Sequence, residues 1–265
     1  VLTAWNALAL AALARAGLVL DEPRYLAAAE KIVSFLSVHL VCPDGRLLAR
    51  WREGEAAHPG KLDDYAFYSW GLLELYGATF APAYLAQAVK LAGIMLDFFF
   101  DRERGGFYPY ASDGEQLLTR TKEVYDGAMP SGNSVAALVL LRLARLTGEN
   151  RWREAAELQM SWLAGAIDYP AGHSFAMLAF LEALWPSAEL VITARAVPVE
   201  LKPFLRQAPH PELTVLLKTP ESADILAGLA PFTKDYPIPE RGSKYYLCRN
   251  GACAQPTDSI ANLGL

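Results

Sequence analysis

Pro23-Arg24-Tyr25-Leu26-x-x-Ala29 opens a motif that returns as Pro82-Ala83-Tyr84-Leu85-x-x-Ala88 and again as Asn150-Arg151-Trp152-Arg153-x-x-Ala156. Each copy follows a short turn. Its first residue is proline or asparagine, which suits the first turn of a helix because the N–H groups there lack intrahelical partners. A unit that recurs in this way indicates a fold built from repeated helical hairpins.

The helices before and after each turn differ in character. Those after the turn are amphipathic, with charged residues such as Glu30 and Lys31 on one side. Those before it are apolar nearly all round, which is typical of buried helices. These inner helices are predicted over Leu2–Ala14, Tyr65–Tyr76, Val135–Leu146 and Phe175–Trp185. The alternation predicts a mainly α fold, a partial (α/α) toroid of helical hairpins.

After Pro186 the sequence changes to short apolar runs separated by prolines, which predicts a small α/β appendage. We expect two domains, the toroid over residues 1–186 and the appendage over residues 187–265. Strands are predicted at Glu189–Thr193, Leu213–Leu217 and Tyr245–Cys248, and short helices at Val199–Arg206 and Glu221–Leu229.

Composition excludes several classes of protein. The net charge of −5 argues against a nucleic-acid-binding surface, which needs clustered lysine and arginine. The longest uncharged stretches fall short of the ~18 apolar residues of a membrane span. We therefore expect a cytoplasmic protein with no nucleic-acid or membrane partner. Because the chain begins inside an apolar helical run, we also expect it to be a fragment of a longer protein.

Two connections between the hairpins are long, from about Val41 to Lys61 and from about Arg102 to Pro130. Connections of this length in a compact domain are usually functional or disordered. Because the hairpins alternate in direction, both should emerge at one end of the toroid. β-Hairpins are predicted there over Gly45–Arg52 and over Phe107–Arg120, the second with a turn at Ser112-Asp113-Gly114.

The inner helices should all begin at this same end, so polar residues from distant segments should meet there. Unpaired N–H groups and the partial positive charge of helix N-termini add to the expected site. The candidate residues are Trp5, Asn6, Asp63, Asp64, Tyr65, Asp126, Ser131, Asn133 and His173. Each also has a structural interpretation: Asp63, Ser131 and Asn133 suit helix caps, Asp126 a turn, and His173 a satisfied buried histidine.

Cys248 and Cys253 flank Asn250-Gly251, a strong signal for a tight hairpin turn. The turn would place the two cysteines opposite each other on paired strands, so a disulfide is geometrically possible. In an intracellular protein two reduced thiols are the stronger expectation. No metal site is expected, because no set of ligands has a recognisable spacing.

Three segments together resemble a known family: Leu2-Thr3-Ala4-Trp5-Asn6, Leu62-Asp63-Asp64-Tyr65-Ala66-Phe67, and Asp126-Gly127-Ala128-Met129-Pro130-Ser131-Gly132-Asn133-Ser134. Over essentially its whole length the chain resembles the helical and C-terminal part of the thioredoxin-domain proteins related to the spermatogenesis-associated thioredoxin-like protein. The resemblance implies a thioredoxin-like domain elsewhere in the parent chain. It also implies a toroid similar to N-acylglucosamine 2-epimerases and six-hairpin glycosidases, with no assigned reaction.

The chain departs from that family in lacking the thioredoxin-like part and in carrying Ala7 where glycine is common. About seven toroid helices cannot close a ring of twelve, which predicts exposed apolar surface and self-association of the fragment.

Two functions of different kinds remain open. The first is acid–base chemistry on a small-molecule sugar, as in an epimerase or glycosidase. Asp64 and Asp126 would be the catalytic pair, the other rim residues would bind substrate, and no cofactor would be needed. The alternative is a non-catalytic binding or scaffolding module that positions the thioredoxin-like domain of the parent. If backbone N–H groups take up both carboxylates, the second function is favoured.

Overall fold

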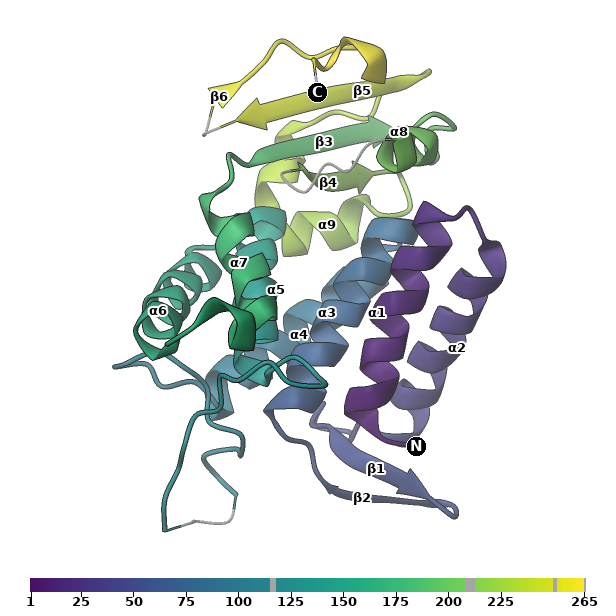
Figure 1. Ribbon diagram of the computed structural model, residues 1–265. Coiled ribbons are helices and arrows are strands. Elements are labelled where there is room, and N and C mark those ends of the chain that lie inside the picture. The colour runs from purple at the N-terminus through teal and green to yellow at the C-terminus, as the bar shows by residue number, and fades with distance from the viewer. Residues whose placement is uncertain (115–117, 208–212, 250–251, 265) are drawn as a thin grey trace.

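The computed structural model describes residues 1–114, 118–207, 213–249 and 252–264. Long helices form the first part of the chain, in line with the predicted hairpins (Figure 1). They are α1 (Thr3–Val19), α2 (Pro23–His39), α3 (Leu62–Thr79), α4 (Pro82–Phe98), α5 (Gly132–Thr147), α6 (Asn150–Ala166) and α7 (Ser174–Leu184). The predicted fold class, a partial α/α toroid with a small α/β part, is confirmed.

The helices form an inner and an outer row. Helices α1, α3, α5 and α7 pack side by side in that order, and α2, α4 and α6 each pack on the inner helix that precedes them. Prolines start α2 and α4 at their first residues, Pro23 and Pro82, as the repeated motif predicts. Helix α3 lies in the middle of the inner row, and for this reason most of its side chains are buried.

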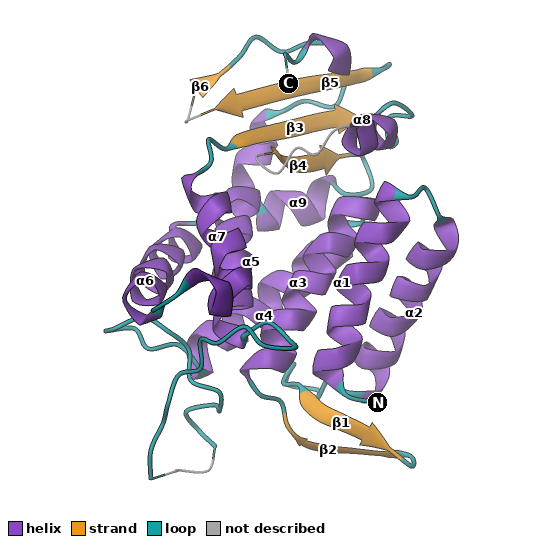
Figure 2. Ribbon diagram, viewed as in Figure 1, coloured by secondary structure: helices purple, strands orange, loops and turns teal. Residues whose placement is uncertain are grey.

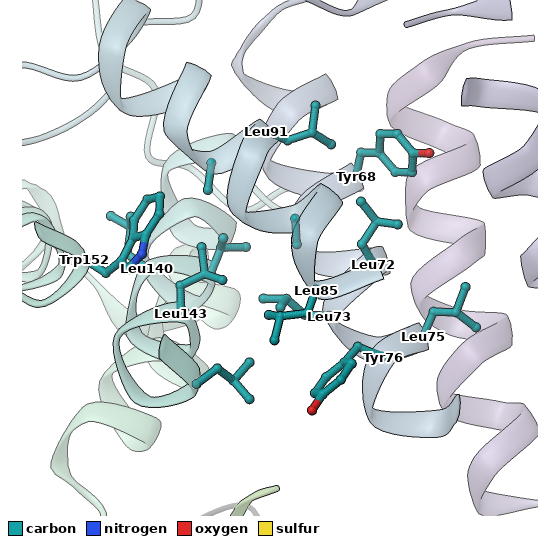
Figure 3. Close-up of a cluster of buried hydrophobic side chains, with 14 of the residues drawn as sticks. Tyr68, Leu72, Leu73, Leu75, Tyr76, Leu85, Leu91, Leu140, Leu143 and Trp152 are labelled. Atoms are coloured by element: carbon teal, nitrogen blue, oxygen red, sulfur yellow. The ribbon is translucent and has the colours of Figure 1, made fainter. Parts of the chain in front are cut away.

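The hydrophobic core lies between the two rows (Figure 3). Leucine and aromatic side chains from neighbouring helices meet there, and each fully buried one contributes about 1.5–3 kcal/mol to stability. The labelled members are Tyr68, Leu72, Leu73, Leu75, Tyr76, Leu85, Leu91, Leu140, Leu143 and Trp152. Tyr84 and Trp152 occupy equivalent positions of the repeat and both pack on the core, whereas Tyr25 of the first copy is exposed.

The α/β part follows α7 and contains a four-stranded sheet in the order β4-β3-β5-β6 (Figure 2). Strand β3 pairs in parallel with β4 and antiparallel with β5, and β5 pairs antiparallel with β6. Its elements are β3 (Ala188–Ala194), α8 (Leu201–Gln207), β4 (Leu213–Lys218), α9 (Ala223–Leu229), β5 (Ser243–Arg249) and β6 (Ala252–Cys253). Short 3-10 helices lie at η1 (Pro170–His173), η2 (Pro231–Asp235) and η3 (Ile260–Asn262).

The sheet lies over the C-terminal ends of the inner helices (Figure 1). Helix α8 contacts α1, and β4 contacts α5. An ion pair between Arg206 and Asp21 joins α8 to the turn after α1. This end of the helical rows is therefore covered, and the opposite end carries the long connections.

A β-hairpin at that opposite end differs from the predicted one. Strand β1 (Leu48–Arg52) pairs with β2 (Glu55–Pro59), so the prediction of a complete hairpin within Gly45–Arg52 is wrong. The reversal falls at Glu53 and Gly54, which both have positive φ. The predicted range therefore contains the first strand of the hairpin but stops before its turn.

The second predicted hairpin, over Phe107–Arg120, is not seen in the described residues of that segment, and residues 115–117 lie outside them. Phe107 forms an isolated bridge with Phe100, and the amide of Gly114 donates to Ala111 O at the predicted turn. Backbone hydrogen bonds to the end of α4 and to the start of α3 also hold this segment, since Tyr108 N donates to Phe99 O and Leu62 N donates to Pro109 O.

Cys248 and Cys253 form a disulfide, which corrects the expectation of two reduced thiols. They lie opposite each other in the β5–β6 pair, as the hairpin signal predicted. The turn residues themselves, Asn250 and Gly251, lie outside the described part of the chain. Cys42 is a free cysteine.

Helix α7 ends the inner row and leaves part of its apolar surface uncovered. Leu178, Leu181, Leu184 and Trp185 are all exposed, which confirms the predicted exposed apolar surface; self-association through it remains a prediction. Within the described ranges, no helix has the combination of length and apolarity needed to cross a lipid bilayer.

Candidate functional site

Asp64 joins the N-terminal ends of α1 and α3, and only 4% of the residue is exposed. Its Oδ1 accepts a hydrogen bond from the backbone N–H of Ala4 in the first turn of α1, at 2.9 Å. Its Oδ2 accepts from the N–H of Lys61, the residue that precedes α3, at 2.8 Å. Both donors are N–H groups that a helix start leaves without intrahelical partners.

Asp63 makes the corresponding connection between α3 and α5. Its carboxylate accepts a hydrogen bond from the N–H of Gly132, the first residue of α5. Burial raises the pKa of Asp63, the charge of Glu123 adds to this, and the Gly132 hydrogen bond acts in the opposite direction. Adjacent residues of one helix start therefore serve two different neighbouring helices.

Asp126 connects α5 to α7, and of the three aspartates it accepts the most backbone hydrogen bonds. Its Oδ1 accepts from the N–H of Ser131 at 2.8 Å, and its Oδ2 accepts from Phe175 and Ala176 at 2.9 and 3.0 Å. Its own N–H donates to Gly172 O at 2.8 Å, which fixes the loop that carries it. The side chain is buried, with 7% of the residue exposed.

Asp63, Asp64 and Asp126, here called the rim carboxylates, thus join each inner helix start to the next. The series runs from α1 through α3 and α5 to α7. The predicted convergence is confirmed: all four inner helices begin at one end, and residues distant in sequence meet there. Every rim carboxylate is directed at backbone N–H groups, where its charge also complements the helix macrodipole.

Asn133 holds the loop that crosses this end. Its Oδ1 accepts from Phe107 N at 2.7 Å, and its Nδ2 donates to Phe107 O and Glu123 O. Gln159 on α6 completes the network by donating to Asn133 Oδ1 and accepting from Gly106 N at 2.9 Å. The amide of Asn133 is buried and its hydrogen-bonding groups are engaged within the protein.

The polar groups of most other predicted site residues also form hydrogen bonds within the chain. Ser131 caps α5, because its side chain accepts from Ser134 N at 3.0 Å. Tyr65 Oη accepts from Leu47 N, His173 Nδ1 lies 2.8 Å from Tyr169 O, and Asn6 Nδ2 donates to Leu2 O.

Trp5 differs from these residues, since 61% of it is exposed on α1. The predicted set therefore lies together at one end, and Trp5 is its most open member.

Burial raises the pKa of Asp64 to about 6, in spite of the two backbone hydrogen bonds that lower it. A carboxyl group whose pKa is higher in the folded state favours folding when protonated. Its contribution is therefore full below the unfolded pKa near 3.8 and is lost as the pH rises through 6. Relative to Asp64→Asn, the free energy of unfolding of the wild type should fall by up to about 3 kcal/mol between pH 4 and pH 7. Urea unfolding at a series of pH values measures this difference. Parallel pH profiles of the two proteins would contradict this.

A glycine pair tests the contact between α3 and α5. A Cβ at Gly132 would collide with Asp63 Oδ1 and with Leu62 Cγ, whereas one at Gly93 in α4 would meet nothing within 4 Å. Gly132→Ala should lower the melting temperature, because it separates two helix starts. Gly93→Ala should raise stability by up to about 1 kcal/mol, since alanine favours a helix over glycine. Equal effects in a thermal melt would show that Asp63 and Gly132 are not in close contact.

The structure also shows a site that the sequence analysis missed, on the concave side of the inner row. A hollow of about 410 Å³ is lined by residues of all four inner helices. The lining residues are Leu8, Ala11, Ala12, Arg15, Trp70, Glu74, Pro130, Arg142 and Phe175. The rings of Trp70 and Phe175 meet edge to face with centroids 5.0 Å apart.

An ion network borders this hollow through Glu74 and Arg142. Arg142 Nη1 lies 2.6 Å from Glu74 Oε1, and Arg142 Nε lies 3.2 Å from Glu182 Oε2. Trp70 Nε1 donates to Glu74 at 3.0 Å, and Arg145 donates to Glu182 O at 2.6 Å. Burial alone would raise the pKa of Glu74, but the charge of Arg142 and its hydrogen bonds outweigh it, and the pKa is lowered overall.

The sequence does contain a signal for this site. Arg15, Glu74, Arg142 and Glu182 are charged residues that lie within the apolar stretches of the four inner helices. A charge on a buried helix needs a partner, so charges of opposite sign within four neighbouring inner helices point to one shared cluster.

An arc of inner helices that all begin at one end, each of the first three followed by an outer helix, defines a partial α/α toroid. No protein-family model matches the chain. Spermatogenesis-associated protein 20 of Homo sapiens is 29% identical over 269 residues, which covers 96% of this chain and 34% of that protein. The resemblance that the three motifs predicted is thus confirmed, and the chain spans about a third of that relative's length.

Two solved structures share the helical fold. Cellobiose 2-epimerase from Bacillus thermoamylovorans aligns with a TM-score of 0.50 and 15% identity, over 60% of this chain and 43% of that one. Cellobiose 2-epimerase from Spirochaeta thermophila aligns with a TM-score of 0.50 and 23% identity, over 60% of this chain and 42% of that one. At these identities the likeness concerns the fold alone.

Proposed function

We propose that this chain is a non-catalytic binding module. One observation carries the proposal: the oxygens of Asp64 and Asp126 accept hydrogen bonds from backbone N–H groups of four different segments. A general acid or base must reach a substrate proton at hydrogen-bond distance. Carboxylates held by two and three backbone donors are instead suited to fixing the helix ends.

The ligand-facing surface in this proposal is the concave hollow. It combines a concave shape, apolar and aromatic walls, and a few convergent polar groups, which are the usual features of a small-molecule site. Trp70 offers a half-buried ring, and Arg15 a charged side chain that is 61% exposed. A module of this kind could also position the thioredoxin-like domain that the family resemblance implies.

A sugar is the ligand class favoured by this lining. Sugar rings have apolar faces that pack on aromatic side chains, and hydroxyl groups that pair with guanidinium and carboxylate groups. Trp70, Arg15 and Glu74 supply these three kinds of group in one hollow. The fold shared with two cellobiose 2-epimerases is consistent with this class, by analogy of fold alone.

Two tryptophans on inner helices make the test specific. Saturation-transfer NMR with cellobiose, mannose and N-acetylglucosamine should detect binding to the wild type, and Trp70→Ala should abolish it. Trp5→Ala is the matched control, because Trp5 lies at the rim outside the hollow, and it should bind as the wild type does. The sugar spectra should not change on long incubation.

Three other results would contradict parts of this proposal. Formation of an epimer or a hydrolysis product that Asp64→Asn abolishes would overturn the non-catalytic proposal. Loss of binding in Trp5→Ala with retention in Trp70→Ala would move the ligand to the rim. Absence of binding by all three sugars would count against the sugar class.

A further inference from the structure

We propose that the Cys248–Cys253 disulfide is a thiol–disulfide exchange site, which an external dithiol reduces while the protein stays folded. This goes beyond the proposed binding function and depends on different residues. The bond joins β5 to β6, the last strand in the order of the sheet. Cys253 is exposed and Cys248 is half-buried, so the pair can be reached from solvent.

The bond is placed where it adds little to the fold. The two cysteines are five residues apart, and a cross-link that closes so short a loop restrains the unfolded chain least. The buried side chains of this sheet are others, such as Leu190, Ile192 and Leu247. Reduction should therefore leave the sheet folded.

The chain that follows β6 is also held independently of the disulfide. Ala254 N donates to Leu247 O at 2.9 Å. Tyr245 and Thr257 exchange two backbone hydrogen bonds, at 2.8 and 3.1 Å. Lys244 Nζ lies 2.7 Å from Asp258 Oδ1. These contacts keep the final segment on β5 when the sulfurs separate.

The disulfide opens on a groove between the sheet and α6, with a volume of about 770 Å³. Met160, Phe232 and Tyr236 give it an apolar lining. Charges of both signs border it, contributed by Arg145, Arg153, Glu157 and Glu189. A partner surface that carries an accessible dithiol surrounded by apolar residues matches a groove of this composition.

The exchange would proceed in two balanced steps. A thiolate of the dithiol attacks Sγ of Cys253, the more exposed sulfur, and expels Cys248 as a thiolate that takes up a proton. The second thiol of the reductant then loses its proton and attacks the mixed disulfide, which releases Cys253 as a thiol. Two electrons and two protons pass to the cysteine pair, and the dithiol becomes a disulfide.

The test uses the whole chain with Cys42→Ser as background, which removes the free cysteine. We expect dithiothreitol to reduce the disulfide without denaturant, as shown by alkylation and mass spectrometry. The melting temperature should change by no more than about 3 °C on reduction. In single-cysteine variants that add Cys248→Ser or Cys253→Ser, Cys253 should form a mixed disulfide with oxidised glutathione roughly tenfold faster than Cys248.

Three results would overturn the proposal. The disulfide would be structural if dithiothreitol reduced it only after unfolding in guanidinium, or if reduction lowered the melting temperature by more than about 3 °C. Faster reaction of Cys248 than of Cys253 would contradict the proposed order of attack.

Discussion

Replacement of Asp126 by alanine is expected to lower the free energy of unfolding by about 3–5 kcal/mol. The variant leaves the N–H groups of Ser131, Phe175 and Ala176 without their acceptor. Each buried donor that loses its partner costs about 1–3 kcal/mol. Because the three donors lie at the starts of two helices, the loss should also loosen the contact between α5 and α7.

Urea unfolding measures this loss, with Asp97→Ala as the matched control. Asp97 is also an aspartate paired by a hydrogen bond, but its side chain is 66% exposed and its partner, Arg102, is exposed as well. Such surface pairs contribute at most about 1 kcal/mol. If Asp126→Ala were no more destabilising than Asp97→Ala, Asp126 would not be holding the helix ends.

Replacement of Arg142 by methionine is expected to have the second large effect. It should lower the free energy of unfolding by about 3–5 kcal/mol. The guanidinium lies between the carboxylates of Glu74 and Glu182, whose side chains are only 10% and 11% exposed. Removing it leaves two buried negative charges close together without their shared partner, whereas methionine retains most of the volume.

The matched rescue adds Glu74→Gln and Glu182→Gln to Arg142→Met. The triple variant should recover most of the lost stability, because the two buried carboxylates are no longer charged and Arg145 keeps its hydrogen bond to the backbone oxygen of residue 182. The deficit of Arg142→Met should also shrink as the pH falls below about 4.5. The lowered pKa of Glu74 stabilises the folded wild type above that value, and this contribution is lost as the pH falls through the folded pKa. A deficit that is constant with pH, or a triple variant as unstable as the single one, would contradict this explanation.

Much of the fold could be predicted because the signals are local. Pro23 and Pro82 mark helix starts, and the apolar runs around Leu72 and Leu140 mark buried helices. The strand predicted at Glu189–Thr193 lies within the observed β3. The shared end of the inner helices followed from alternating direction alone, which needs no knowledge of side-chain contacts.

The contacts of the site could not be predicted, because they depend on which neighbour each side chain meets. Asp63 and Asp64 have the same local signal but serve helices on opposite sides of α3. Arg142 is a charge within an apolar stretch of α5, and the sequence does not show that Glu74 and Glu182 lie beside it. The disulfide could not be predicted either, because the sequence spacing of Cys248 and Cys253 does not show whether their sulfurs are oxidised.

Hydrogen exchange of the Phe175 and Ala176 amides tests most directly whether the rim carboxylates hold the helix ends. These amides lie in the first turn of α7, where intrahelical acceptors are missing, and Asp126 Oδ2 is their acceptor. Both should be protected in the wild type, and the protection should fall in Asp126→Ala while the amides in the middle of α7 keep theirs. Free exchange of both amides in the wild type, or protection that survives in the variant, would contradict the account.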